Sequence, residues 1–306
     1  MSGARPGMVQ VPGSRFTMGS ADFYPDEGPV HERTVETFWL DRCEVTNADF
    51  GRFVADTGYV TVAERPLDEA AFPDLAPEDR APGALVFTPT DGPVDLRDWS
   101  RWWRWQPGAS WRRPEGPGSS IEGRLDHPVV QVAYPDAAAY ARWAGKRLPT
   151  EAEHEHAARG GGDDRSPFAW GDAPYPGGVP QAHTWLGRFP YDWGGAGGPT
   201  TAPVGSYPAN GLDLLDMIGN VWEWTSDFYA PRHVPPGTAP VDAGTRPSLL
   251  AAASAEAGST VPRRVLKGGS YLCSPDYCLR FRPSARSPQA DDTATTHIGF
   301  RCADDA

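Results

Sequence analysis

Turn-forming residues interrupt this 306-residue sequence along its whole length. Its 34 glycines and 33 prolines leave little room for long helices or strands, which argues against a helical bundle or a repetitive α/β sheet. Its 12 tryptophans, 10 tyrosines and 12 phenylalanines supply the core-forming side chains that disordered chains lack. We therefore expect one folded domain over residues 1–306, in which short elements are joined by long irregular segments.

The first 60 residues contain two local patterns. Residues 8–18 alternate apolar and polar side chains and are broken by proline and glycine, which predicts a short hairpin. Thr46 is followed three residues later by Asp49, a capping pattern that begins a helix, and Gly58 ends it.

Residues 127–160 form the most regular part of the sequence. Residues 127–134 read as a strand, followed by a helix over 136–143 that Asp136 caps. Thr150 and Glu153 form a capping box for a second helix, which Gly160 ends. Two short helices on a strand-rich body indicate the α+β class.

Two further regions have less regular patterns. Residues 66–118 are rich in Pro, Asp and Trp and predict a packed excursion bordering a cleft, although the tryptophans could equally just fill an irregular core. Residues 265–287 and 297–302 resemble strands, and we expect them to line a site.

Charge and hydropathy exclude several classes of partner. A net charge of −12 argues against nucleic acid, which needs a basic face. No apolar run is long enough for a signal peptide or a membrane span, so we expect a soluble, cytoplasmic protein. Four cysteines in a chain of this length do not make a disulfide scaffold, and a reducing compartment would keep them as thiols.

Cys273 and Cys278 are the strongest chemical signal. Four intervening residues, in a strand-like run, suit neither a zinc knuckle nor a thioredoxin-type pair, whereas two thiolates suit Cu(I). The spacing alone fits a structural disulfide or two buried thiols equally well. Residues 260–301 hold seven Lys or Arg against three Asp, which predicts a basic pocket that favours thiolates, or else a run of solvated surface arginines.

Five phrases carry a family resemblance: GKRLPTEAE, GNVWEW, KGGSYLCSPDYC, ARS and GFRC. In this order and at these separations they resemble the formylglycine-generating enzyme (sulfatase-modifying factor) family, of the actinobacterial type, from about residue 8 to residue 304. The CSPDYC element is typical of the catalytic branch. The resemblance implies an α+β, atypical duplicated C-type-lectin-like fold with little regular secondary structure.

The resemblance also implies a reaction and a substrate. A cysteine in an unfolded Cys-x-Pro-x-Arg segment of a sulfatase joins Cys273 and Cys278 on Cu(I), and O2 oxidises it to Cα-formylglycine. The sequence leaves open a non-sulfatase peptide as substrate, and relatives imply a monomer. A non-catalytic lectin-like module would need no thiol pair. An iron-dependent sulfoxide synthase would need an additional helical domain that this chain is too short to hold.

Five residues match positions around the family's active site. Ser270 and Tyr277 are expected to hydrogen-bond the oxygen or the substrate thiol, and Trp222 to separate copper from water. Arg286 is expected to hold the peptide backbone. His297 is expected to have a polar positioning role, with a buried, hydrogen-bonded histidine as the alternative.

The match implies a structural calcium ion as well. Its ligands would be the side chains of Asp216 and Glu223 and the backbone carbonyls of Gly219 and Val221. His183 stands where relatives with a second calcium site have asparagine, so we expect that site to be weak or absent.

The sequence also carries expectations for the remaining two cysteines and for two helical histidines. The partners of the family's structural disulfides are missing, so Cys43 and Cys302 are expected to be free; they could pair only if the fold brings their Cα atoms within about 7 Å. His154 and His156 lie two residues apart on a helix and point to different faces, so we expect surface or interface histidines and no shared metal.

Overall fold

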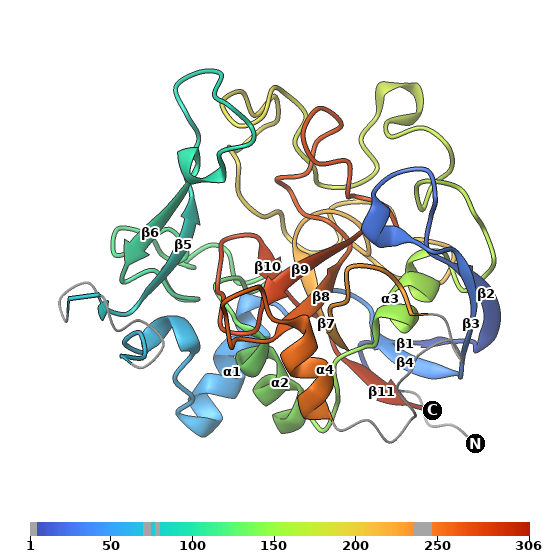
Figure 1. Cartoon of the computed structure of the whole chain (residues 1–306), viewed down its shortest axis with the longest axis horizontal. Coiled ribbons are helices and arrows are strands. Elements are labelled where there is room, and N and C mark those ends of the chain that lie inside the picture. The colour runs from blue at the N-terminus through green and yellow to red at the C-terminus, as the bar shows by residue number, and fades with distance from the viewer. Residues whose placement is uncertain (1–4, 70–74, 77–79, 235–246) are drawn as a thin grey trace.

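The computed structural model describes residues 5–69, 75–76, 80–234 and 247–306 (Figure 1). Its helices are α1 (Asn47–Thr57), α2 (Tyr134–Trp143), α3 (Glu151–Ala158) and α4 (Pro247–Ser254). Its strands are β1 (Met8–Val11), β2 (Ser14–Met18), β3 (His31–Val35), β4 (Phe38–Asp41), β5 (Gly83–Phe87), β6 (Trp103–Pro107), β7 (Trp222–Phe228), β8 (Arg263–Lys267), β9 (Arg286–Ala290), β10 (Ile298–Gly299) and β11 (Ala303–Asp305). Irregular segments connect these short elements, which confirms the predicted α+β class with little regular secondary structure.

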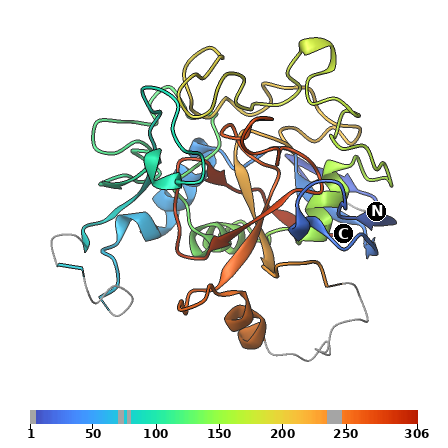
Figure 2. The same ribbon diagram turned by 45° about the horizontal axis from the view of Figure 1, so that its top comes forward.

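The strands of the described residues form four small sheets. The largest has the order β10-β7-β8-β9, and a second has the order β1-β4-β11. The strands β2-β3 and β5-β6 form two-stranded sheets. Figure 2 shows β8 (orange) near the middle of the molecule, with the β5–β6 region (teal) on one side and the N-terminal strands (blue) on the other.

The helix caps at Thr46 and Thr150 are confirmed. In both helices the threonine side chain accepts from the third helical N–H and the acidic residue accepts in return. Gly58 ends α1 in the left-handed conformation with a φ of 66°. Asp136 does not occupy the predicted capping position: it is the third residue of α2, and its carboxylate accepts from the N–H of Ala133, where the helix begins.

One predicted hairpin and one predicted strand are wrong. Residues 8–18 do not form a hairpin, because β1 pairs with β4 and β2 pairs with β3. Residues 127–134 contain only an isolated bridge from Pro128 to Thr46. The N–H groups of Val129 and Gln131 bond to carbonyls in two different segments, and Gln131 has a φ of 59°, which no regular strand accommodates. Apolar and polar residues do alternate in residues 8–18, but the backbone groups to which both segments hydrogen-bond belong to other segments of the chain.

The predicted surface position of His154 and His156 is also wrong. Both are fully buried because α3 packs against β2, β3, β7 and β8. The Nε2 of His154 lies 3.3 Å from the carboxylate of Glu223, whereas His156 contacts Phe16 and the carbonyl of Pro12. The two rings do point to different neighbours, as their spacing indicated.

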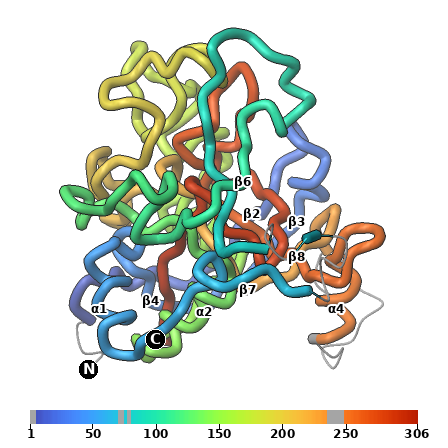
Figure 3. Tube along the Cα trace, turned by 90° about the vertical axis from the view of Figure 1, so that its left-hand side faces the viewer, coloured from blue at the N-terminus to red at the C-terminus, as the bar shows by residue number. Residues whose placement is uncertain are grey.

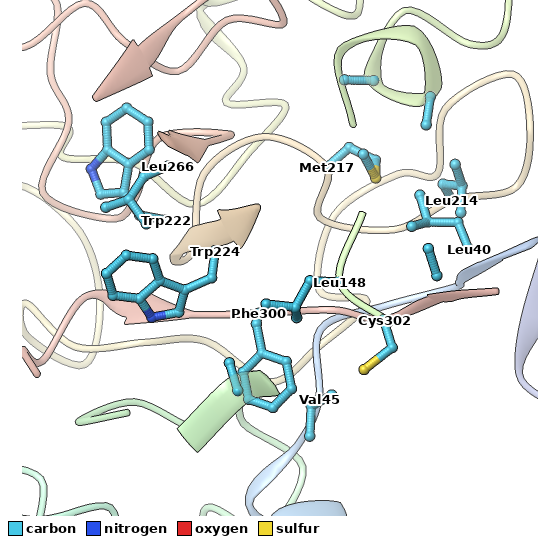
Figure 4. Close-up of a cluster of buried hydrophobic side chains, with 14 of the residues drawn as sticks. Leu40, Val45, Leu148, Leu214, Met217, Trp222, Trp224, Leu266, Phe300 and Cys302 are labelled. Carbon is cyan, nitrogen blue, oxygen red and sulfur yellow. The ribbon is translucent and has the colours of Figure 1, made fainter. Parts of the chain in front are cut away.

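One hydrophobic cluster connects the central sheet to the helices. Figure 4 shows Trp222 and Trp224 of β7 beside Leu266 of β8, with Phe300 and Cys302 next to Leu40 and Val45. The indole N–H of Trp224 donates to the carbonyl of Val132 at 3.0 Å, so this buried polar atom is satisfied. Cys273 belongs to the same cluster and is buried with it.

The segment from residue 66 to residue 118 packs as predicted in part. Residues 70–74 and 77–79 lie outside the described residues, but β5 and β6 form a hairpin that bonds to residues 294–296 (Figure 3). Trp102 and Trp111 are buried and fill the core, whereas Trp99 and Trp103 line a cavity of about 480 Å³. Both readings of the tryptophans therefore apply, each to different residues.

Candidate functional site

The two predicted cysteines meet at a turn. Their sulfur atoms are 3.3 Å apart, and residues 274–278 turn back through hydrogen bonds from the N–H groups of Tyr277 and Cys278 to the carbonyl of Ser274. The predicted strand-like run is wrong. Five residues of strand would separate the two residues by roughly 16 Å and place their side chains on opposite faces. The turn is what makes a bidentate sulfur site possible.

Burial and neighbouring charges make the two thiols unequal. Cys273 is only 1% exposed, and its burial raises its pKa well above that of an ordinary thiol. The hydrogen bond from Cys273 lowers the pKa of Cys278, and the positive charges of Arg280 and Arg282 lower it further. The two sulfurs therefore differ electrostatically, and Cys278 is the one whose deprotonation its surroundings favour.

The basic residues around the pair are already neutralised. All seven Lys and Arg side chains between residues 260 and 301 have acidic partners, most of them from distant segments. Four of the seven are at most 2% exposed, so the alternative of solvated surface arginines is wrong for those four: Lys267, Arg282, Arg286 and Arg301. The local excess of positive charge serves the fold, and Arg280 and Arg282 also act on Cys278.

Ser270 and Tyr277 lie next to the thiols, where the sequence placed them. The N–H of Cys273 donates to the carbonyl of Ser270 at 2.9 Å, and the Ser270 hydroxyl contributes to lowering the pKa of Cys273 against the larger effect of burial. The Tyr277 ring stacks on Phe189 with a centroid distance of 4.3 Å and contacts the edge of Trp102. Burial and the negative charge of Cys278 raise the pKa of Tyr277 to about 12, so its phenol keeps its proton.

Trp222 and His297 are joined through the backbone. The N–H of Trp222 donates to the carbonyl of His297 at 2.9 Å, where β7 and β10 pair. The His297 ring packs against Trp103 at 4.8 Å, and its Nδ1 lies 2.6 Å from the hydroxyl of Thr295. Burial lowers the pKa of His297 to about 3, so its imidazole is neutral near pH 7.

Arg286 lies in a buried set of hydrogen bonds. Its guanidinium pairs with Glu151 at 2.7 and 2.9 Å and donates to the backbone carbonyls of Asp26 and Ala230. Through these contacts, Arg286 holds segments that are distant in the sequence together. Its predicted contact with a substrate backbone stays a prediction.

Several residues at this site were not predicted from the sequence. The Tyr24 hydroxyl accepts from the N–H of Leu279 at 3.1 Å, and Asp26 pairs with Arg280 at the same distance. Phe189 and Trp102 complete the aromatic wall behind Tyr277. These residues come from loops far from the CSPDYC element, and no local pattern marks them.

The donor set at the two cysteines fits Cu(I). Soft thiolates select this ion, and the close approach of the sulfurs allows both to bind one metal. Within the described residues, no group of three or more His, Cys, Asp or Glu side chains could hold a metal ion. A metal held by this pair alone keeps a position open for a further ligand.

The predicted calcium ligands fit the ion less well. Asp216, Gly219 and Val221 belong to the loop that enters β7, and Glu223 lies within β7. Both Glu223 oxygens already accept from the Arg301 guanidinium at 2.7 Å. A calcium ion would have to share or displace that cation, so calcium binding stays a prediction.

The other sequence-level expectations have mixed outcomes. All four cysteines are unpaired, so Cys43 and Cys302 are free as expected. The Nε2 of His183 lies 2.8 Å from the carbonyl of Thr200, and the second calcium site stays untested. Among the described residues, no helix combines the length and apolarity needed to cross a membrane.

Comparisons with known proteins agree with the motifs. The family described as "Sulfatase-modifying factor enzyme 1-like domain" matches residues 2–306. The formylglycine-generating enzyme of Mycobacterium tuberculosis is 58% identical over 301 residues, covering 97% of each protein. That of Streptomyces coelicolor is 45% identical, covering 99% of this chain and 92% of the relative. The solved structure of PvdO from Pseudomonas aeruginosa has a TM-score of 0.62 at 24% identity, covers 99% of this chain and 100% of PvdO, and shows the same fold.

Proposed function

Because the chain belongs to the family of sulfatase-modifying factor enzyme 1-like domains, we propose that it oxidises a cysteine in another polypeptide to Cα-formylglycine. Cys273 and Cys278 would hold Cu(I), and O2 would be the oxidant. The observation that carries this proposal is the 3.3 Å approach of the two sulfurs, since a binding module of the same fold has no need of it. The high identity to enzymes named for this product supports the same conclusion.

The reaction balances without other protein groups changing oxidation state. The substrate Cβ and sulfur lose two protons and two electrons to give a thioaldehyde, whose hydrolysis releases hydrogen sulfide and leaves the aldehyde. Dioxygen accepts the two electrons as peroxide, or becomes water when two equivalents of an added thiol, oxidised to the disulfide, supply two more. Copper, when bound, supplies the affinity for a third thiolate and for dioxygen.

The chain's own residues would position the substrate and exclude water. Ser270 is buried, and Tyr277 keeps its proton, so each offers a hydroxyl donor beside the thiols. Trp222 is 5% exposed and belongs to the hydrophobic cluster that contains Cys273, which supports a role in keeping water away from the metal. His297 is neutral and would position, not protonate, the substrate.

The cavity beside His297 supports a polypeptide substrate. It has a volume of about 480 Å³, which accommodates several side chains of an extended peptide. Trp99 and Trp103 line it together with polar residues such as Gln289 and Thr293. Trp103 belongs to the same aromatic cluster as Phe189 and Tyr277, and Tyr277 lies beside the thiols. We propose that it holds residues flanking the reactive cysteine of a sulfatase Cys-x-Pro-x-Arg segment.

The same proposal includes a structural calcium ion at Asp216, Gly219, Val221 and Glu223, a monomeric state and a cytoplasmic location. Asp216 and Glu223 are both buried acids, and Glu44 next to them has a carboxylate oxygen without a hydrogen-bond partner. A buried carboxylate oxygen without a hydrogen-bond donor favours a hard cation, and here the nearest cation is the Arg301 guanidinium, 3.9 Å from that Glu44 oxygen. The competing guanidinium of Arg301 makes this the weaker of the two metal proposals.

The test is a peptide conversion assay. The Cu(I)-loaded protein is incubated in air with a synthetic Cys-x-Pro-x-Arg peptide and a reducing thiol, and mass spectrometry follows the exchange of H2S for one oxygen atom. We expect conversion by the wild type and none by Cys273→Ser or Cys278→Ser. Cys302→Ser, at a buried free thiol outside the site, is the matched control and should keep activity. Binding of Cu(I) without conversion would indicate another peptide substrate, and no Cu(I) binding would refute the metal site.

A further inference from the structure

A short N-terminal segment braces the chain directly after Cys278. We define this brace as residues 23–27, which lie about 250 positions before the thiol pair. Its Tyr24 hydroxyl accepts from the N–H of Leu279 at 3.1 Å, and its Asp26 pairs with Arg280 at 3.1 Å. The next residue of the brace, Glu27, forms a fully buried ion pair with Arg282. The brace therefore contacts three of the four residues that follow Cys278.

Tyr24 is itself held in place, through its ring as well as through its hydroxyl. The Arg280 guanidinium lies 4.0 Å from the centre of its ring, and Asp26 fixes that guanidinium. Burial raises the pKa of the Tyr24 hydroxyl further above neutral, so the hydroxyl stays protonated. A neutral, oriented hydroxyl thus bonds to the peptide group that joins Cys278 to Leu279.

We propose that Tyr24 is a positioning residue that fixes the Cys278 sulfur relative to Cys273. In the turn that brings the sulfurs together, the carbonyl of Ser274 accepts hydrogen bonds from the N–H groups of Tyr277 and Cys278. The next N–H, that of Leu279, bonds outside the turn, to Tyr24. Without the hydroxyl, the peptide after Cys278 loses its anchor, and the sulfur gains freedom to rotate away from its partner.

This inference rests on the proposed function, because it concerns Cu(I) binding. A metal bound by only two protein ligands depends on both sulfur positions, and residues that orient metal ligands typically contribute about 10- to 100-fold to affinity. Tyr24 makes a single neutral hydrogen bond to the backbone, so we expect the lower end of this range.

The experiment compares Tyr24→Phe with Tyr59→Phe in the full chain. Tyr59 is also partly buried and also makes a 3.1 Å hydrogen bond through its hydroxyl, to Asp136, outside the site. Cu(I) affinity is measured by competition with a chromogenic chelator, and thermal unfolding of the metal-free proteins is measured in parallel. We expect Tyr24→Phe to weaken Cu(I) binding about tenfold, and Tyr59→Phe to leave it within about twofold of the wild type.

Three outcomes would overturn the inference. Cu(I) affinity of Tyr24→Phe within about twofold of the wild type would show that the hydroxyl does not position the sulfur. Equal weakening in both variants would show a general structural effect. Wild-type protein that fails to bind Cu(I) would refute the proposed function itself, and the role of Tyr24 with it.

Discussion

The buried ion pair between Glu27 and Arg282 should be among the most sensitive points of the fold. Both side chains are 0% exposed. Arg282 binds both carboxylate oxygens of Glu27, and the Ser284 hydroxyl donates to one of them at 2.9 Å. The pair joins the brace to the chain that follows Cys278. We expect Arg282→Met to destabilise the protein strongly, because it leaves the Glu27 carboxylate buried with a single hydroxyl donor.

The magnitude follows from the burial of both groups. Removing one partner of a fully buried ion pair costs about 3–5 kcal/mol, since the remaining charge is uncompensated. Unfolding entropy near 2.1 cal/mol/K per residue gives about 640 cal/mol/K for a chain of 306 residues. A loss of about 4 kcal/mol then lowers the Tm by about 6 °C. Replacing both partners, as in Glu27→Gln with Arg282→Met, should recover part of this loss because no charge is left behind.

Urea unfolding of the two single variants, the double variant and the wild type forms a complete thermodynamic cycle. The double variant should be more stable than the sum of the two single losses predicts. Strict additivity, or a single-variant loss below about 1 kcal/mol, would refute the argument that the charge is buried and uncompensated. Arg15→Met, at an exposed pair with Glu32, is the matched control and should change stability by less than about 1 kcal/mol.

Three further predictions concern pH and metal. Burial alone would raise the pKa of Glu155, but Lys267 and Arg159 lower it to about 2, below its value in the unfolded chain. This carboxylate should therefore contribute on the order of 3 kcal/mol to the free energy of unfolding above pH 4.5, and the contribution should be lost as the pH falls towards 2. Urea unfolding should show this pH dependence in the wild type and not in Glu155→Gln. Since His297 is neutral, His297→Asn should leave the shape of the kcat/KM profile from pH 5.5 to 8 unchanged, and the disappearance of an inflection would contradict this. Chelation with EGTA should lower the Tm by about 4 °C if calcium at about 100 times its Kd occupies the Asp216 loop, whereas an unchanged Tm would favour Arg301 as the resident cation.

The sequence predicted well where the physics is local. The caps of α1 and α3 depend on residues three positions apart, so Thr46 and Thr150 could be recognised without knowing the rest of the fold. The strand pairings of residues 8–18 failed because their partners lie later in the chain. The buried histidines of α3 failed for the same reason: nothing within the helix shows that other elements surround it.

The residues of the candidate site likewise divide into those that a local motif predicts and those that it does not. Cys273 and Cys278 could be identified from one short motif, but spacing alone left a disulfide and a metal site equally open. The turn that decides their geometry depends on Ser274 and, as we propose, on Tyr24, which lies 254 positions before Cys278. A side chain contributed from such a distance has no signature in the local sequence.

Buried ion pairs explain how a chain with so little regular secondary structure holds this site. Basic residues of the C-terminal segment pair with acids from earlier in the chain, including Arg282 with Glu27 and Lys267 with Glu155. Such pairs contribute less to stability than apolar packing of the same volume, but they penalise any arrangement that leaves one charge without its partner. A loop-rich chain has many competing compact arrangements, and the pairs select the one that places the brace beside Cys278. The thiol geometry therefore depends on the same contacts that specify the fold, which is why destabilising the Glu27–Arg282 pair should also weaken Cu(I) binding.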